Sequence, residues 1–251
     1  MPGRFIALEG TDGVGKTSLA CHVADLNYDT AITRLTQPDV GVGELAFVAR
    51  RQVSATSTYA ATLMQHLSTM LWHSGDAPDL SDAFWVSLQA AWFTAHTETV
   101  LAPLLAAGFD VVVDGWLHKF FAKLLIQGFT EADLAVIFNR VRMPDAVVLL
   151  HADAGAVFDR RRDFRPAELG MHASYGELDD LGRDTFVDYQ TKTALNLQKF
   201  ADRYGWHTVE LDPDEPISAT AQRLAPIMAE LRTPADPAPM ATATRNGEVP
   251  R

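Results

Sequence analysis

Two glycines, a lysine and a threonine near the start of the chain have the types and the spacing of a phosphate-binding loop. Residues 10–18 read Gly-Thr-Asp-Gly-Val-Gly-Lys-Thr-Ser, which matches the pattern G-x-x-x-x-G-K-[ST]. Glycines at these places let backbone N–H groups face an anion, while a lysine can bridge the outer phosphates of a nucleotide and a hydroxyl can bind Mg²⁺. We therefore expect Lys16 and Thr17 to bind a nucleoside triphosphate and its metal.

The residues on either side of the loop predict the elements that position it. Residues 4–8 form a short apolar run typical of a buried strand, and residues 16–26 have apolar side chains at helical spacing. This context disfavours the alternative of a glycine-rich turn that binds nothing. The residues expected around the phosphates of ATP are Gly10, Asp12, Gly13, Val14, Gly15, Lys16, Thr17 and Ser18.

The charge balance limits the kinds of partner. The chain has 251 residues, with 21 Lys and Arg against 32 Asp and Glu, so its formal net charge is −11. A broad basic face for nucleic acid or an anionic membrane is disfavoured, and any cationic site must be local. The single cysteine, Cys21, excludes an internal disulfide and a thiolate-rich zinc site, and the spacing of the histidines indicates no zinc site.

A cytoplasmic protein is expected. The chain starts directly in an apolar run without a basic-then-apolar leader, and no apolar run is long enough to cross a bilayer.

Short apolar runs alternate with longer periodic segments. The predicted strands are residues 4–8, 30–35, 110–114, 146–151 and 207–211. The predicted helices are residues 16–26, 43–51, 59–72, 80–107, 131–141, 154–162, 186–204 and 217–232, with a bend or a new turn at Pro103. This order predicts an α/β fold, with a five-stranded parallel sheet, helices on both faces and ligands beyond the carboxyl ends of the strands.

The predicted domain covers residues 1–232 and includes an arginine-rich lid at about residues 153–183. From Thr233 the composition changes to Pro, Ala and Thr without apolar periodicity. Such a segment cannot bury enough apolar surface to fold, so residues 233–251 are predicted to be a disordered tail.

Asp114 ends the third predicted strand with a carboxylate. A carboxylate at this place can bind Mg²⁺ directly or through water, or can orient an attacking hydroxyl, because ligands of parallel sheets bind at the carboxyl ends of strands. The alternative is that Asp114 caps the helix that follows, which is a common use of Asp.

Four arginines lie close together after the fourth predicted strand. Arg160, Arg161, Arg162 and Arg165 fall within about two turns of a helix or its end, so several of them point in one direction. A lid can use such arginines to stabilise charge on a transferred phosphoryl group. The alternative is a solvated cluster balanced by neighbouring carboxylates. We expect Arg161 and Arg165 to act on the transferred group and Arg160 to bind ATP.

Residues 5–18 resemble the opening of the thymidylate kinase family of P-loop kinases. Glu9 and Asp12 match acidic positions of that family, and a weaker resemblance in order and spacing extends over most of residues 1–232. The resemblance implies an ATP- and Mg²⁺-dependent kinase in which Asp12 faces the sugar of the acceptor. Since members of the family commonly pair through helices, it also implies a homodimer.

The acceptor side departs from the family pattern. Gln37 stands where an arginine is expected, Phe93 and His96 fall in a helical element that lacks its arginine, and Asp114-Gly115-Trp116 replaces Asp-Arg-Tyr. The residues assigned to the acceptor by resemblance are Asp12, Gln37, Phe93, His96 and Trp116. Because a neutral amide cannot grip phosphate as arginine does, either the acceptor is less anionic or a neighbouring cation substitutes. The neighbouring cations are Arg34, Arg50, Arg51 and Lys119.

Three functions remain open at this level. The first is a kinase for a small nucleotide or nucleoside-like acceptor. The second is a kinase for a less anionic acceptor, such as a nucleoside, a modified base or another alcohol, including bases within DNA, although the acidic charge disfavours a nucleic-acid partner. The third is an ATP-binding sensor or partner subunit that has lost transfer activity.

Overall fold

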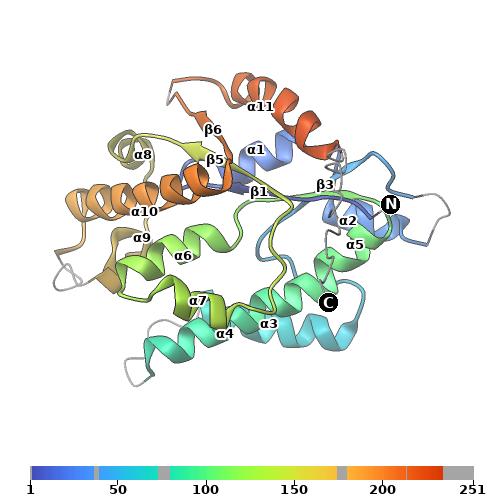
Figure 1. Ribbon diagram of the computed structural model, residues 1–251, viewed down its shortest axis with the longest axis horizontal. Coiled ribbons are helices and arrows are strands. Elements are labelled where there is room, and N and C mark those ends of the chain that lie inside the picture. Colours follow the sequence, from blue (N-terminus) through green and yellow to red (C-terminus); the bar gives the residue numbers. More distant parts are fainter. Residues whose placement is uncertain (1, 37–39, 73–79, 174–179, 213, 234–251) are drawn as a thin grey trace, which may run out of the picture.

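The centre of the computed structural model is a parallel sheet of six strands in the order β2-β3-β4-β1-β5-β6 (Figure 1). The structure describes residues 2–36, 40–72, 80–173, 180–212 and 214–233. The strands are β1 (Phe5–Glu9), β2 (Leu26–Asn27), β3 (Leu45–Val48), β4 (Asp110–Val113), β5 (Ala146–His151) and β6 (His207–Glu210). The α/β class with helices around a parallel sheet is confirmed, with one strand more than predicted.

Helices connect these strands. They are α1 (Lys16–Val23), α2 (Tyr28–Arg34), α3 (Thr58–Trp72), α4 (Asp82–His96), α5 (Ala102–Ala106), α6 (Leu117–Ile126), α7 (Glu131–Ile137), α8 (Ala154–Arg160), α9 (Pro166–Leu169), α10 (Arg183–Tyr204) and α11 (Ile217–Arg232). A π-helical segment, Thr97–Leu101, joins α4 to α5, and a 3₁₀ turn, Met171–Ala173, follows α9. Among the described residues, none of the helices combines the length and the apolar character needed to span a bilayer.

The central strands β1, β3, β4 and β5 are largely buried on both faces, whereas β2 and β6 are more exposed, and successive side chains point to opposite sides of the sheet. Phe5 and Ala7 of β1 belong to a core with α3 to α7, whereas Ile6 and Leu8 belong to a core with α1, α8 and α11. Figure 1 shows α1 and α11 on one side of the sheet, with α3, α4 and α7 on the other. Burial on both faces explains why the strands read as continuous apolar runs.

Two local predictions were wrong. Residues 30–34 of the predicted strand 30–35 belong to α2, which begins where the Asn27 side chain accepts a hydrogen bond from the N–H of Thr30. Residues 43–51, predicted as a helix, contain β3, whose four residues pair in parallel with β4. Short apolar runs fit either element, and here the pairing partner decides.

The predicted helix over residues 80–107 is interrupted. It consists of α4, the π-helical segment and α5. Pro103 stands in the first turn of α5, the part of a helix that tolerates a residue without a backbone N–H. Helices α7 and α8 end at Ile137 and Arg160, earlier than predicted. Helix α6 is not among the predicted helices, although it follows β4 directly and contributes two lysines to the site.

Candidate functional site

A cavity of about 670 Å³ opens beyond the carboxyl ends of β1, β3 and β4. Six cationic side chains and four carboxylates line it, in a chain whose net charge is −11. Its charged lining residues are Asp12, Lys16, Arg50, Arg51, Asp114, Lys119, Arg161, Asp163, Arg165 and Glu168. The local excess of cations is what an anionic ligand requires.

The phosphate-binding loop lies along one side of this cavity. Gly15 adopts a left-handed conformation with a φ of 99° immediately before α1, and no side chain caps that helix in the described structure. The N–H groups of its first turn are therefore free to bind an anion. Gly13 has a φ of 82°, and a Cβ atom there would lie 2.8 Å from atoms of Val157 and Arg161. Glycine is thus required by both backbone conformation and close packing.

Lys16 lies over the loop. Its ammonium donates hydrogen bonds to the carbonyl oxygens of Gly10, at 2.9 Å, and Thr11, at 2.5 Å. Burial and the charge of Lys119 lower the pKa of Lys16 to about 7, although Asp12 and Glu9 oppose this shift. A phosphate group in the cavity would supply the negative charge that favours the protonated form.

Thr17 and Asp114 face one another at the mouth of the cavity. The Thr17 hydroxyl donates to Asp114 Oδ2 at 2.6 Å, and the backbone N–H of Arg50 donates to Asp114 Oδ1 at 2.7 Å. These hard oxygen ligands fit Mg²⁺, which binds one or two protein oxygens and takes the rest from phosphates and water. Within the described residues, no group of three or more His, Cys, Asp or Glu side chains could hold a metal.

Glu9, rather than Asp114, receives the N-terminal N–H groups of α6. Its fully buried carboxylate accepts hydrogen bonds from the N–H groups of Trp116 and His118, each at 3.0 Å, and of Lys119 at 3.3 Å. Burial raises the pKa of Glu9, but the His118 side chain, the N–H of Trp116 and the charge of Lys16 together lower it overall. Asp114 is thereby left to bind Thr17 and Arg50, and its expected alternative role as a helix cap is not observed.

Asp12 is held by two lysines. Both lysines belong to α6, and each ammonium lies 2.5 Å from one oxygen of the Asp12 carboxylate, Lys119 from Oδ1 and Lys123 from Oδ2. Burial opposes ionisation of Asp12, but the charges of Lys119, Lys123 and Lys16 lower its pKa well below the usual value. Asp12 lines the cavity, but both of its oxygens already accept charged hydrogen bonds, so contact with an acceptor sugar remains a prediction.

The sequence interpretation missed Lys123 and Gln190 as partners of Asp12, and it named Lys119 only as a possible cation for the acceptor. Lys119 and Lys123 are four residues apart and therefore lie on one face of α6, a spacing that could have indicated the pair. Gln190, from α10, accepts a hydrogen bond from the N–H of Asp12 at 3.1 Å. Nothing local in the sequence points to Gln190, because 178 residues separate it from Asp12.

The lid arginines have separate surroundings rather than one helical face, because α8 ends at Arg160. Arg160 donates to the carbonyl of Gly13 at 2.9 Å, and Arg161 pairs with Glu168 at 3.1 Å. Arg161 and Arg165 line the cavity, whereas Arg162 is exposed and does not. The structure thus brings the three arginines predicted to bind or act on ATP to the loop or the cavity.

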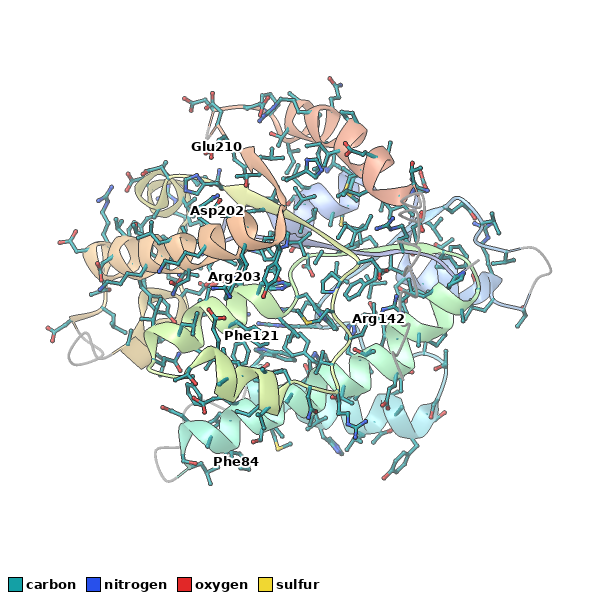
Figure 2. The ribbon with its side chains drawn as sticks, viewed as in Figure 1. Phe84, Phe121, Arg142, Asp202, Arg203 and Glu210 are labelled. Carbon is teal, nitrogen blue, oxygen red and sulfur yellow. The ribbon has the colours of Figure 1, made fainter. Side chains whose placement is uncertain are left out.

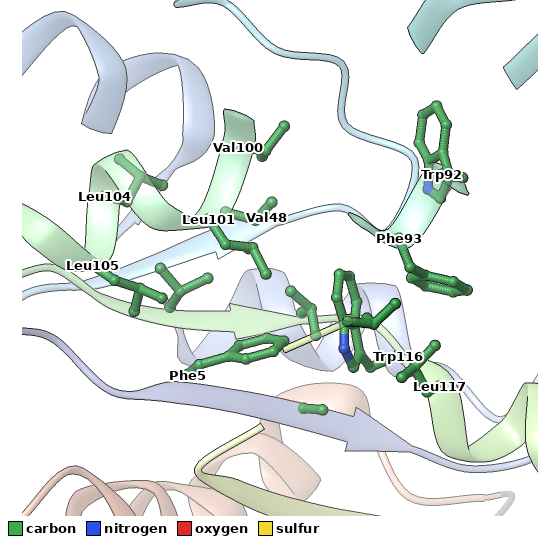
Figure 3. Packing of buried hydrophobic residues seen from close by; sticks show 14 of the residues in the cluster. Phe5, Val48, Trp92, Phe93, Val100, Leu101, Leu104, Leu105, Trp116 and Leu117 are labelled. Carbon is green, nitrogen blue, oxygen red and sulfur yellow. The ribbon is translucent and has the colours of Figure 1, made fainter. Parts of the chain in front are cut away.

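Three residues assigned to the acceptor by resemblance lie in the core instead. Phe93, His96 and Trp116 are at most 1% exposed, and none of them lines the cavity. Trp116 packs edge-on against Phe93, with ring centroids 4.8 Å apart, between α4 and the sheet (Figure 3). Their assignment to the acceptor is therefore corrected to a packing role. Gln37 lies outside the described residues.

The aromatic side chains of α4 do not offer an exposed face to the cavity. Phe84, 43% exposed, lies at the start of α4, at the lower edge of the molecule in Figure 2. Trp92 is buried, and its indole N–H donates to the carbonyl of Arg50 at 3.2 Å. His96 Nε2 lies 3.2 Å from the carbonyl of Ala49. The buried end of α4 thus supports residues 49–57, which we call the arginine loop.

The arginine loop holds the cations that were expected elsewhere. The strand beside β4 is β3, and the residues that follow it, Arg50 and Arg51, line the cavity. Burial, together with the charges of Arg50 and Arg165, lowers the pKa of Arg51 to about 10, and its guanidinium lies 4.7 Å from the ring centroid of Trp72. Two of the substitute cations named from the sequence therefore line the cavity.

The other two candidate substitutes differ from this pair. Arg34 pairs with Glu44 at 2.8 Å and does not line the cavity. Lys119 lines the cavity but is bound to Asp12. Of the four candidate substitutes, Arg50 and Arg51 are thus the two that line the cavity without a carboxylate partner among the described residues.

Comparison with known proteins agrees with this arrangement. No family model matches the chain. The chain is similar to a thymidylate kinase of Jannaschia sp. (strain CCS1), with 27% identity over 228 residues that cover 85% of this chain and 92% of that protein. At the level of the family, this similarity supports a nucleotide kinase. Together with the phosphate-binding loop and the parallel sheet, it supports the chain as a divergent thymidylate kinase-like member.

Proposed function

We propose that the protein is an ATP- and Mg²⁺-dependent phosphotransferase that moves the γ-phosphoryl group of ATP to a nucleotide acceptor. One observation carries the proposal. A single cavity is lined by the phosphate-binding loop, by the Thr17–Asp114 pair, by the lid arginines and by the arginine loop. Phosphoryl transfer depends mainly on positioning and charge stabilisation, and this lining can supply both.

On the ATP side, the loop amides and Lys16 bind the outer phosphates. Thr17 and Asp114 would hold Mg²⁺, which when bound neutralises charge on the phosphate oxygens. Arg161 and Arg165 stabilise the charge that develops on the transferred group, as donors aimed at a transition state do. Glu168 holds Arg161 in place on the lid side of the cavity.

On the acceptor side, Arg50 and Arg51 support an acceptor that already carries a phosphate. Among the described residues, neither guanidinium has a carboxylate within salt-bridge distance, and each lines the cavity. Neighbouring guanidinium groups repel one another unless an anion lies between them, and arginine binds phosphate bidentately. A nucleoside monophosphate supplies that anion, whereas an uncharged nucleoside or alcohol does not.

The proposal is tested with a panel of acceptors. The protein is mixed with ATP, Mg²⁺ and each of a set of nucleosides, nucleoside monophosphates and oligonucleotides, and ADP formation is measured. We expect at least one monophosphate to accelerate ADP formation and Lys16→Ala to abolish this acceleration. Lys192→Ala, a surface lysine that pairs with Asp188 on α10, is the matched control and keeps the parent rate.

Several outcomes would contradict the proposal. If no acceptor accelerates ADP formation and Lys16→Ala behaves like the parent, the protein is not a kinase. Tight ATP binding without turnover would indicate a sensor or partner subunit. Transfer to nucleosides but not to monophosphates would indicate the less anionic acceptor, and transfer to oligonucleotides alone would indicate a polymer substrate.

A further inference from the structure

One buried amide joins the phosphate-binding loop to the lid. Gln190 lies on α10 and is 1% exposed. Its Oε1 accepts a hydrogen bond from the backbone N–H of Asp12 at 3.1 Å. Its Nε2 donates to the carbonyl of Glu168 at 2.8 Å and lies 3.3 Å from Asp12 Oδ2. The same side chain therefore contacts the loop with one end of its amide and α9 of the lid with the other.

Glu168 extends this connection to the lid arginines. Its carboxylate accepts hydrogen bonds from the Arg161 guanidinium and from the backbone N–H of Arg165, each at 3.1 Å. Both arginines line the cavity. The carbonyl of Glu168 is thus held by Gln190 while its side chain holds the two arginines. A displacement of α9 would consequently move the guanidinium groups relative to the loop.

Lys123 makes a second, weaker tie between the same two segments. Its ammonium lies 2.5 Å from Asp12 Oδ2 and 3.4 Å from the carbonyl of Ala167, the residue before Glu168. The ammonium also lies 5.0 Å from the ring centroid of Tyr189. Because Lys123 contributes charge to Asp12 as well as a contact to α9, replacing it would change the loop and the lid together. Gln190 is therefore the cleaner probe.

We infer that Gln190 is a positioning residue that fastens α9 to the phosphate-binding loop and so holds Arg161 and Arg165 over the cavity. A glutamine suits this place because its amide offers an acceptor to the Asp12 N–H and a donor to the Glu168 carbonyl. An apolar side chain of similar length would leave both groups without these partners. The kinetic consequence rests on the proposed function, but the attachment of α9 does not.

The structural consequence is measured by hydrogen exchange. In Gln190→Met, we expect the amides of residues 168–170 to exchange about tenfold faster than in the parent, while β5 keeps its protection, because a local tie has been lost. The matched control is Gln198→Met. Gln198 lies on the same helix, where its amide bonds Asp202 at 2.7 Å, and we expect parent-like exchange at residues 168–170.

The kinetic consequence is a split between kcat and KM. With the acceptor found by the panel above, we expect Gln190→Met to lower kcat about tenfold while the KM for ATP changes less than about threefold, since Lys16, Thr17 and the glycines of the loop are unchanged. A purely structural role would instead lower the exchange protection of amides throughout the protein, β5 included, without this selective loss of kcat.

A second variant covers the case in which Gln190→Met does not fold. Gln190→Glu keeps an acceptor for the Asp12 N–H but cannot donate to the Glu168 carbonyl, so α9 exchanges faster while the loop amides stay protected. If residues 168–170 exchange in the folded variant as they do in Gln198→Met, the inference is overturned. An inactive parent protein would remove the proposed function but would leave this exchange comparison valid.

Discussion

The two sides of the cavity hold their cationic side chains in different ways. On the phosphate side, Lys16 lies within a continuous loop and bonds carbonyls five and six residues before it. On the side proposed for the acceptor, the backbone groups of Arg50 and its neighbour Ala49 contact Trp92, His96 and Asp114, at separations of 42, 47 and 64 residues. The first arrangement is local and readable from a motif, whereas the second exists only after distant segments pack.

The largest expected effect is at Asp114, where the two sides meet. Asp114→Asn keeps an oxygen for the N–H of Arg50 but loses the negative charge beside Thr17. We expect kcat to fall about 10³-fold, the loss typical of a group that stabilises the transition state electrostatically. Steady-state phosphotransfer assays at saturating ATP would measure it.

The matched control for Asp114 is at the other end of the same strand. Asp110→Asn weakens a pairing with Arg232 at 2.9 Å, away from the cavity, and the folded protein should keep a parent-like kcat. A loss of less than tenfold in Asp114→Asn would contradict a metal-binding role and would leave only the Thr17 contact.

The next effect separates the acceptor side from the phosphate side. Arg50→Leu should raise the KM for a phosphorylated acceptor about 100-fold, because charge-assisted hydrogen bonds to phosphate are lost. The KM for ATP should change less than about threefold. Arg34→Leu, which removes the salt bridge to Glu44 outside the cavity, is the control and should leave both values unchanged. Equal effects on both substrates would mean that the two sides are not distinct.

The third prediction concerns pH and the support beneath the arginine loop. Burial lowers the pKa of His96 to about 4, against 6.5 for an unperturbed side chain. Its Nδ1 has no hydrogen-bond partner among the described residues, so protonation would leave a charged donor unsatisfied. The unfolded chain takes up this proton near pH 6.5, whereas the folded chain does so only near pH 4. The contribution of neutral His96 to the free energy of unfolding is therefore complete above pH 6.5 and decreases as the pH falls toward 4.

Denaturant unfolding at a series of pH values would measure this slope. As the pH falls from 6.5 to 4, the free energy of unfolding should decrease by about 3 kcal/mol because of His96. His96→Gln should show a smaller decline over the same interval, while His66→Gln, on the exposed face of α3, should keep the parent slope. Parallel curves for the parent and His96→Gln would contradict the assignment.

The smallest effect tests the same support through one hydrogen bond. Trp92→Phe keeps an aromatic ring in the core but removes the N–H that donates to the Arg50 carbonyl. We expect a loss of about 1 kcal/mol in stability from this bond and a rise of about fivefold in the KM for the acceptor. Trp85→Phe, on the same helix and only partly buried, is the control. An acceptor KM that is unchanged in Trp92→Phe would mean that the loop holds its position without α4.

Much of the fold follows from apolar runs and periodicity. Strands β1, β4 and β5 lie where apolar runs predict them, since strands buried on both faces must be largely apolar, and β6 also lies where it was predicted although it is mostly exposed. Residues 30–35 were predicted as a strand and residues 43–51 as a helix, and both predictions were wrong because short apolar runs fit a strand or a helix equally well. Only the parallel pairing of β3 with β4 separates the two. In the cavity, residues of the glycine-rich loop and Asp114 lie where they were expected, and Arg50 and Arg51, named from the sequence only as possible substitutes, line it as well.

The sequence by itself determined the phosphate-binding loop, because glycines with left-handed backbone and a following lysine and threonine are needed consecutively. It also determined that a carboxylate, Asp114, directly follows β4 and that arginines follow β5. Only the tertiary structure decided that Phe93, His96 and Trp116 fill the core, that Arg50 and Arg51 face the cavity, and that Gln190 joins the loop to the lid. These relations join residues distant in the chain, and burial and hydrogen-bond pairing arise only when the helices pack on the sheet.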